Sequence, residues 1–354
     1  MVLLWLLWII LACYLLSIVC DRYFVVSLDE IAKKWKLRDD VSWATLMAVW
    51  SSAPELFTSL IALFSWAKVG LGAGTIIWSA IFNILIIIWG SALFLKAVLD
   101  KKILLRDSLF YALSILLIFL SFWDGQVTLV ESVLFLAAYL FYILYLIYFW
   151  NKRSSHIDEL VHVVEHEVED LEETLEKKSV VFQWIDTLIE STFPKKSSAY
   201  VSVFFISLWW IILLSWLLVE SGVVLAQSLW IPEVIIWLTI LAAWTSVPDL
   251  ISSIIVAKQG RGDMAVTNAL GSNIFDICFC LWFPRFIYAL IHGSVPISTA
   301  WLWISVSLLF GILILVFCTF VLTKFRINKY VWWFFISIYL AYVCWMIWWV
   351  LFAA

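Results

Sequence analysis

Three carboxylates lie deep within apolar stretches of the chain, at Glu55, Asp249 and Asp276. A carboxylate at the centre of a membrane-spanning helix costs about 2.5–3.5 kcal/mol to insert, so it needs a compensating partner. The central turns of these stretches and of their polar neighbours contain no lysine or arginine. A bound cation is therefore the natural counter-charge. The alternative is that the carboxyl groups are protonated and hydrogen-bonded within a helix bundle.

The residues around two of these carboxylates suit a hard cation such as Ca²⁺ or Na⁺, which prefers oxygen ligands. Pro54 and Pro248 each precede a carboxylate by one position. Each proline removes a backbone donor and frees a carbonyl oxygen of the preceding turn. Unpaired backbone at this depth is tolerated only where it lines a cavity or binds an ion. Hydroxyl side chains stand at the same two predicted breaks, at Ser51, Ser52, Thr245 and Ser246.

The segment that contains proline and a carboxylate occurs twice. Residues 50–59 read Trp-Ser-Ser-Ala-Pro-Glu-Leu-Phe-Thr-Ser, and residues 244–253 read Trp-Thr-Ser-Val-Pro-Asp-Leu-Ile-Ser-Ser. A second matched pair, 79–83 and 272–276, ends 28 positions (83 − 55) and 27 positions (276 − 249) after the respective carboxylates. Duplicated, proline-broken polar segments in the two halves of a membrane protein indicate an ion or substrate site near the midplane.

The segments that must position these residues are apolar helices. Hydrophobic residues make up 65% of the 354 positions and charged residues only 14%, which excludes an ordinary soluble domain. A transmembrane helix must cross roughly 30 Å of hydrocarbon. We predict an all-α integral membrane protein with ten transmembrane helices, at residues 2–20, 43–65, 70–95, 107–122, 127–149, 199–219, 232–256, 264–282, 298–322 and 330–352.

The basic residues indicate how these helices are oriented. When the loops are assigned alternately to two sides, 20 of the 22 lysines and arginines fall on one side, and only Lys68 and Arg285 on the other. By the positive-inside rule the rich side is cytoplasmic, so both termini lie outside. We expect a protein of the plasma (inner) membrane with the polar segment 150–198 in the cytoplasm.

The two copies of the polar motif have opposite orientations. The first lies in the predicted second helix and the second in the seventh, and this odd offset makes the copies antiparallel. The predicted organisation is a five-helix half at 1–149 with its repeat at 43–95, and a second five-helix half at 199–354 with its repeat at 232–282. The acidic, amphipathic segment between the halves is either a solvated connector or a regulatory element that senses ions or a partner.

The duplicated segments resemble a known family. Ser-Ser-Ala-Pro-Glu-Leu-Phe-Thr-Ser at 51–59 is similar to the first alpha-repeat of the sodium/calcium exchangers of the cation/calcium antiporter superfamily. Thr-Ser-Val-Pro-Asp-Leu-Ile-Ser-Ser at 245–253 and Asn-Ala-Leu-Gly-Ser-Asn-Ile-Phe-Asp at 268–276 are similar to the second. Aspartates at positions 249 and 276 resemble the potassium-dependent branch more than the potassium-independent one.

The resemblance implies a role for each residue of the predicted site. Glu55 and Asp249 would be the central Ca²⁺/Na⁺ ligands. Asn83 and Asp276 would flank them, with Asp276 bearing on potassium. Because Asn83 is neutral and Asp276 is charged, we expect this asymmetry to set how many monovalent ions or protons accompany the cycle. Further side-chain or nearby backbone oxygens would come from Ser51, Ser52, Ser79, Thr245, Ser246 and Ser272.

We therefore expect a secondary active antiporter that exchanges calcium for sodium by alternating access, with potassium as a further candidate ion. No enzyme activity, cofactor, nucleic acid or obligate protein partner is predicted, and the lipid bilayer is the expected environment. The resemblance implies that the first and sixth helices slide past the core as gates. One alternative is a proton/calcium exchanger, although its usual Asn-Ala-x-Glu centre is absent from this sequence. A second is a non-transporting membrane scaffold or sensor.

Three tryptophans depart from this resemblance. Trp50, Trp78 and Trp244 stand where the family has glycine, and Trp78 corresponds to Gly271 in the second repeat. The chain contains 25 tryptophans and 11 glycines, although glycine usually makes up about 7% of a protein. One hypothesis is that many of these tryptophans are glycines in the living protein, because a genetic code that reads UGA as glycine was translated with UGA as tryptophan. The other is that the tryptophans are real and crowd the site.

Overall fold

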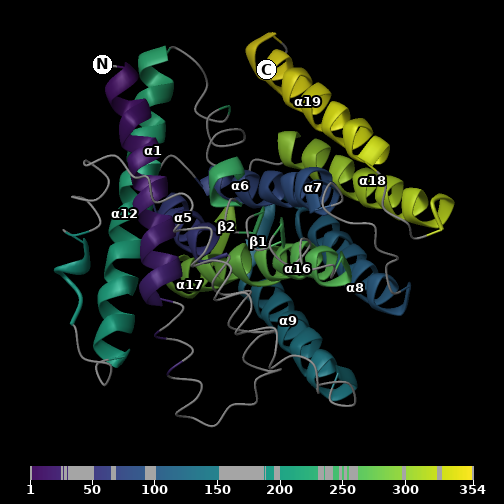
Figure 1. Ribbon diagram of the computed structural model, residues 1–354, viewed down its shortest axis with the longest axis horizontal. Coiled ribbons are helices and arrows are strands. Elements are labelled where there is room, and N and C mark those ends of the chain that lie inside the picture. Colours follow the sequence, from purple (N-terminus) through teal and green to yellow (C-terminus); the bar gives the residue numbers. More distant parts are fainter. Residues whose placement is uncertain are drawn as a thin grey trace.

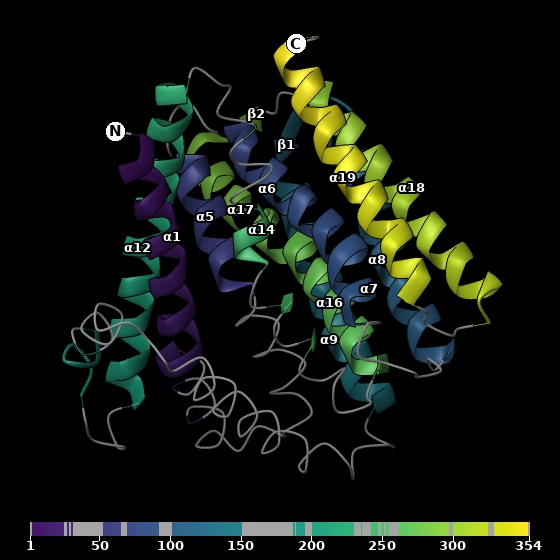
Figure 2. The same cartoon turned by 45° about the horizontal axis from the view of Figure 1, so that its top comes forward.

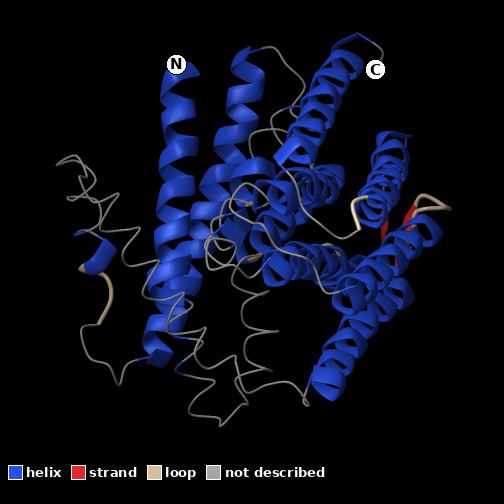
Figure 3. Cartoon of the chain, turned by 45° about the vertical axis from the view of Figure 1, so that its right-hand side comes forward, coloured by secondary structure: helices blue, strands red, loops and turns tan. Residues whose placement is uncertain are grey.

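Helices make up nearly all of the part of the chain that the structure describes (Figure 1 and Figure 3). The computed structural model describes residues 2–24, 52–64, 69–91, 101–150, 189–194, 200–229, 242–246, 262–296, 300–324 and 329–352, together with 27, 30, 187, 235, 249, 250, 253 and 254. Most of the acidic segment 150–198 therefore lies outside the described residues, and neither interpretation of it is tested.

The helices of the first half follow the predicted order. They are α1 (Val2–Val19) with the π-helical turn η1 (Cys20–Phe24), α5 (Ala53–Phe64), α6 (Val69–Phe82) continued by η3 (Asn83–Ile87) and α7 (Ile88–Ser91), α8 (Lys101–Ser121) and α9 (Leu129–Trp150). Because α6, η3 and α7 follow one another without a break, they form a single helix with a widened turn near its middle.

The helices of the second half repeat this plan. They are α12 (Tyr200–Leu229), α14 (Ala242–Thr245), α16 (Gly262–Phe275) continued by η7 (Asp276–Cys280) and α17 (Trp282–His292), α18 (Ala300–Leu322) and α19 (Lys329–Phe352). Seven helices among the described residues are long and apolar enough to cross a membrane. The predicted spans 43–65 and 232–256 are described only in part.

Two helices extend past the predicted spans in a way that matters for the charges. The span predicted at 107–122 begins at Lys101, and the span predicted at 264–282 continues to His292. Arg285, which the sequence placed in an outer loop, is therefore inside α17, where it is only 1% exposed. The sequence pattern misled because Pro284 and Arg285 interrupt the apolar run, yet the chain stays helical through both residues, directly after the widened turn η7.

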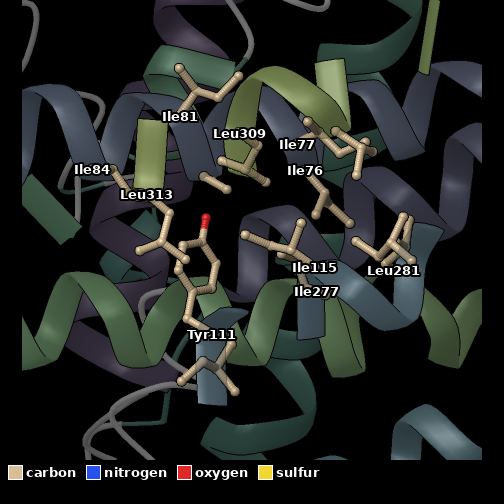
Figure 4. Close-up of a cluster of buried hydrophobic side chains, with 14 of the residues drawn as sticks. Ile76, Ile77, Ile81, Ile84, Tyr111, Ile115, Ile277, Leu281, Leu309 and Leu313 are labelled. Carbon is tan, nitrogen blue, oxygen red and sulfur yellow. The ribbon is translucent and has the colours of Figure 1, made fainter. Parts of the chain in front are cut away.

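The apolar core surrounds α6 and η3. Of the residues in Gly72–Gly90, 89% are buried. Ile77 and Ile81 of this segment meet Ile115 of α8 and Leu309 of α18 in the cluster drawn in Figure 4. In a bilayer, where lipid is as apolar as these side chains, such close packing rather than water exclusion holds helices together. This core fixes the helix that carries Ser79 and Asn83.

Helices α1 and α12 lie side by side at one edge of the molecule, away from α18 and α19 (Figure 1 and Figure 2). Tyr23 after α1 stacks on Phe193 before α12, with ring centroids 3.6 Å apart. Helix α12 also packs against α5. The first and sixth predicted spans thus form one pair that contacts the core through a helix of the site.

Two short strands were not predicted. β1 (Gln126–Thr128) pairs with β2 (Ser294–Pro296) in antiparallel register, with Val127 opposite Val295. The pair, red in Figure 3, joins the loop between α8 and α9 to the loop between α17 and α18. Three-residue strands carry too little alternation to be recognised in sequence.

Candidate ion-binding site

The two halves carry the same widened turn at equivalent polar residues. In η3 the backbone N–H of Ile88 donates to the carbonyl of Asn83. In η7 the N–H of Leu281 donates to the carbonyl of Asp276, at 2.8 Å. Such a turn inserts one extra residue into a helix and is frequent at functional sites. The predicted duplication therefore extends to a local backbone feature that begins at a predicted ligand in each copy.

The proline segment of the first repeat begins a helix that contacts η7. Helix α5 starts at Ala53, so Pro54 lies in the first turn, where its missing N–H breaks no helical hydrogen bond. The N–H of Leu56 donates to the carbonyl of Ser52 at 3.0 Å, and the N–H of Leu250 donates to that of Ser246 at 3.1 Å. Trp50, Ser51 and Pro248 lie outside the described residues, as does the side chain of Trp244.

Within each copy, a serine of the second motif approaches the carboxylate of the first. The Ser272 hydroxyl donates to Asp249 Oδ1 at 2.8 Å. The Ser79 hydroxyl lies 3.5 Å from Glu55 Oε1. These four predicted site residues are all buried, with exposed fractions between 0% and 2%. A contact between a serine hydroxyl and a carboxylate thus occurs once in each copy of the repeat.

Other contacts join the two copies. The hydroxyls of Ser79 and Ser246 share a hydrogen bond of 2.6 Å. Asn83 Nδ2 donates to Asp249 Oδ2 at 3.2 Å, and the Thr245 side chain lies beside the Glu55 carboxylate. These residues are about half the chain apart in sequence, so the structure assembles one site from both halves.

The sequence did not identify Asn273 and Tyr111. Asn273 Nδ2 donates to the carbonyl of Ala80 at 3.1 Å and lies 3.3 Å from the Tyr111 hydroxyl. Because a carbonyl can only accept, Asn273 must turn Oδ1 the other way, where it accepts from Asn83 Nδ2 at 2.9 Å. The Asn83 amide is thereby oriented. One sequence signal could have identified Asn273. When the two repeats are aligned, Asn273 stands opposite Ala80, so a polar residue replaces an apolar one.

Several oxygens of this buried site have no hydrogen-bond partner. They are Ser52 Oγ, Glu55 Oε2, Asn83 Oδ1, Asp276 Oδ1 and Asp276 Oδ2, and the four residues are 0% exposed. Buried polar atoms are nearly always paired, so each such group needs an explanation. When the carboxylates are ionised, four of these five oxygens can only accept hydrogen bonds, and Ser52 Oγ can also donate one. Buried acceptors without a donor fit a bound cation, which supplies the missing positive charge.

The charges at the site are all of one sign. Glu55 is repelled by both Asp276 and Asp249, and no lysine or arginine acts on Glu55 or Asp276 in the described part of the chain. One N–H of Arg285 donates to the carbonyl of Leu281 at 2.6 Å, and Arg285 does not neutralise the carboxylates. A cation must therefore supply the balancing charge if the carboxylates are ionised.

No group of three His, Cys, Asp or Glu side chains within the described ranges is arranged to hold one metal ion alone. The oxygens that surround the carboxylates must share in any coordination shell. Ser52 and Cys280 lie near Asp276, and the hydroxyls and the amide named above lie near Glu55 and Asp249. A mixed shell of carboxylate, hydroxyl and amide oxygens is suited to Ca²⁺ and other hard cations, not to a tight transition-metal site.

Comparison with known proteins agrees with this chemistry. The family model described as sodium/calcium exchanger protein matches residues 5–148 and 199–348. Sodium/potassium/calcium exchanger 5 of Homo sapiens is 32% identical, over 85% of this chain and 74% of the relative. Sodium/potassium/calcium exchanger 2 of Gallus gallus is 27% identical, over 89% of this chain and 72% of the relative.

A solved structure of the sodium-calcium exchanger NCX_Mj has a similar fold. It superposes with a TM-score of 0.58 at 24% sequence identity, and the match covers 97% of this chain and 99% of that one. Together with the family match to both halves, this likeness confirms an all-α membrane fold of ten helices in two inverted repeats. The matched ranges leave out the acidic segment at 149–198.

Proposed function

Because the chain belongs to the sodium/calcium exchanger family, we propose that it is a secondary active antiporter that exchanges Ca²⁺ for Na⁺ at the buried oxygen site. The observation that carries the proposal is the set of unpartnered oxygens contributed by both repeats. Family membership alone says only that the chain is a cation/calcium exchanger. The specific ions and residues are inferred from the chemistry of the site.

The central ligands would be Glu55 and Asp249. Their two negative charges match one Ca²⁺, and Ca²⁺ takes about six to eight oxygen ligands in flexible geometry. Glu55 Oε2, Asn83 Oδ1 and Ser52 Oγ have no partner and are suited to the shell. Asp249 already accepts from Ser272 and Asn83, which holds its carboxylate in place.

Exchange follows from competition for these oxygens. Three ionised carboxylates in a buried, apolar surrounding are strongly unfavourable without counter-charge. One Ca²⁺ or a set of Na⁺ ions neutralises the site, and either loading permits the transition between outward-open and inward-open states. An ion shifts such an equilibrium only by its differential affinity for the states. The empty, charged site would then cross slowly, which couples the two fluxes.

Asp276 is the candidate ligand for an additional monovalent ion. The Ser52 hydroxyl and the Cys280 thiol lie near its carboxylate without making a hydrogen bond of good geometry, whereas the equivalent Asn83 is neutral and donates to two neighbours. The curated relatives are sodium/potassium/calcium exchangers by name. We therefore include potassium, or one more sodium, as an ion whose binding depends on Asp276.

The moving part would be the pair α1 and α12. The two helices pack on each other at the edge of the molecule, and α12 contacts α5, which carries Glu55 (Figure 2). Sliding of this pair past α5 would expose the site first to one side and then to the other. The distribution of basic residues supports an orientation in the plasma (inner) membrane with both termini outside and segment 150–198 in the cytoplasm.

Flux in reconstituted vesicles tests the ions. An outward Na⁺ gradient should drive uptake of ⁴⁵Ca²⁺ into proteoliposomes, and collapse of that gradient should stop it. Uptake that ignores Na⁺ but follows a pH gradient would replace this proposal with the proton/calcium exchanger. No uptake under any Na⁺, K⁺ or pH gradient would favour a non-transporting scaffold.

Glu55→Gln tests the site. Removing one charge from the Ca²⁺ ligands should reduce Na⁺-driven uptake to background. The matched control is Glu190→Gln, which makes the same change at an exposed carboxylate and should leave uptake unchanged. Normal transport by Glu55→Gln would refute the assignment of the site.

A further inference from the structure

Among the described residues, four tryptophans have a buried indole N–H without a hydrogen-bond partner, and three of them, all except the partly buried Trp332, are almost fully buried. Trp78, Trp89 and Trp282 are 1%, 0% and 0% exposed, and Nε1 of each has no hydrogen-bond partner. The N–H of a buried tryptophan usually finds a partner, since a buried unsatisfied donor is unfavourable. The same orphan donor therefore occurs three times among the largest buried side chains of the molecule.

Each of these indoles stacks on an aromatic ring of another helix. Trp78 precedes Ser79 on α6 and stacks on Tyr342 of α19, with ring centroids 4.5 Å apart. Trp89 on α7 stacks on Phe335 of α19 at 4.5 Å. Trp282 on α17 stacks on Phe135 of α9 at 3.8 Å. These positions are interior, so an interfacial aromatic belt, which explains exposed tryptophans of membrane proteins, does not explain them.

The internal duplication shows that tryptophan and glycine alternate at one position. Trp78 precedes Ser79 in the first repeat, and Gly271 precedes Ser272 in the second. Both positions lie in a helix that continues into a π-helical turn. A Cβ added to Gly271 would meet only the Tyr142 hydroxyl, at 4.0 Å. The smallest and the largest residue thus occupy the same place in two copies of one structure.

Two further pairs of tryptophans recur in register. Trp89 lies six positions after Asn83 (89 − 83), and Trp282 lies six positions after Asp276 (282 − 276). Trp50 and Trp244 open the two proline segments. The chain has 25 tryptophans against 11 glycines, whereas glycine normally accounts for about 7% of residues and is among the commonest. Tryptophan occupies the share that glycine usually has.

We propose that positions 78, 89 and 282, together with 50 and 244, carry glycine when the chain is made in its own cell, where UGA codons are read as glycine. Glycine at positions 78, 89 and 282 removes the three fully buried indole N–H groups that have no hydrogen-bond partner. It also makes position 78 equal to its partner in the second repeat. Without a side chain at 78, α6 and α19 can approach more closely beside Ser79, which is where small residues favour tight helix packing in membranes.

The gene and the native protein decide the identity of these residues directly. We expect UGA codons at positions 50, 78, 89, 244 and 282, and glycine in the corresponding peptides when the protein from its own cells is sequenced by mass spectrometry. UGG codons, or tryptophan in those peptides, would overturn the proposal. This measurement does not depend on what the protein transports.

A transport measurement tests the consequence, and it rests on the proposed antiport. We compare the chain as written with the variant that carries glycine at all five positions. Na⁺-driven ⁴⁵Ca²⁺ uptake should be at least about tenfold faster in the glycine variant, equivalent to about 1.4 kcal/mol. Equal rates in two chains that both transport would overturn the claim that indoles obstruct the site.

Two control variants separate the causes. Trp78→Phe removes the indole N–H and keeps the bulk, so it should recover little uptake if crowding is the obstacle. Trp123→Gly changes an indole that is 80% exposed and should have no effect. If the native peptides contain glycine and no variant transports Ca²⁺, the residue assignment stands and the proposed antiport fails.

Discussion

At the scale of single residues, the site is held by a donor network that leaves selected oxygens free. Asn83 gives its N–H groups to Asp249 and Asn273, and Asn273 is itself fixed by the carbonyl of Ala80. Asn83 Oδ1 has no hydrogen-bond partner, and the Asp276 carboxylate has only the Ser52 hydroxyl and the Cys280 thiol near it, without a hydrogen bond of good geometry, among the described residues. The two repeat-equivalent residues therefore differ in charge and in how firmly they are held.

Asn273→Ala should weaken Ca²⁺ binding without removing a proposed ligand. Asn83 would lose the acceptor that orients it, and loss of such supporting groups typically costs about 10–100-fold in metal affinity. The measurement is the Ca²⁺ concentration that gives half-maximal Na⁺-driven uptake. Asn268→Ala, on the same helix but bonded to Ser253, is the control. An unchanged half-maximal concentration in Asn273→Ala would show that Asn83 needs no such support.

Asp276→Asn should change the number of monovalent ions that accompany each Ca²⁺. The substitution makes the second repeat chemically equal to the first, where Asn83 is neutral. The voltage at which net Ca²⁺ flux reverses, under fixed Na⁺ and K⁺ gradients, reports this stoichiometry. We expect a shifted reversal voltage relative to the parent, while Asp124→Asn, at an exposed carboxylate, shifts nothing. The same voltage in Asp276→Asn would mean that Asp276 binds no coupled ion.

At the scale of elements, close approach of α5 and α6 brings Ser79 to Glu55. Gly72 permits this approach, because a Cβ there would lie 3.2 Å from Ser59 Cα and 3.3 Å from its carbonyl oxygen. These neighbours are backbone atoms, which cannot move aside as a flexible side chain does. The two π-helical turns act at the same scale, since each begins at a polar residue of the site.

Gly72→Ala should therefore destabilise the protein and slow transport. Overpacking of a close contact costs about 1–3 kcal/mol. Thermal unfolding in detergent should show a lower midpoint, and uptake should fall because α6 shifts relative to Glu55. Gly311→Ala is the matched control, since no atom lies within 4 Å of a Cβ added there. Equal melting of the two variants would contradict the role given to Gly72.

At the scale of the whole molecule, the corrected position of Arg285 sharpens the charge asymmetry. With Arg285 inside α17, Lys68 is the one basic residue that the sequence assigns to the outer loops. The first residues of α8, including Lys101 and Lys102, extend a helix on the basic side. The positive-inside rule thus favours the proposed orientation more strongly than the original assignment did.

Protease protection in right-side-out membranes tests this orientation. A peptide tag at the C-terminus should be removed by external protease, and a tag inserted in segment 150–198 should be protected until the membrane is opened. The opposite pattern would reverse the orientation. Removal of both tags, or protection of both, would contradict a structure of ten crossings with the loop and the termini on different sides.

The helical membrane fold and the key residue types were predictable from sequence for a clear physical reason. A long apolar run in a bilayer must satisfy its backbone internally, so it has essentially one solution, a helix. Counting those helices gave the inverted repeat, which the structural likeness confirms. Buried carboxylates beside proline marked Glu55 and Asp249 as exceptional, because their cost in lipid demands a partner.

Only the tertiary structure decided which groups meet. Asn83 and Asn273 are 190 residues apart and Ser79 and Ser246 are 167 apart, and no local pattern encodes such a contact. The orientation of the Asn83 amide depends on a carbonyl of α6 that reaches Asn273 only after the halves have packed. The burial of Arg285 likewise depends on the helix that extends around it. Local chemistry therefore determined the elements and the buried carboxylates, and the packing of two distant halves determined which polar groups meet around them.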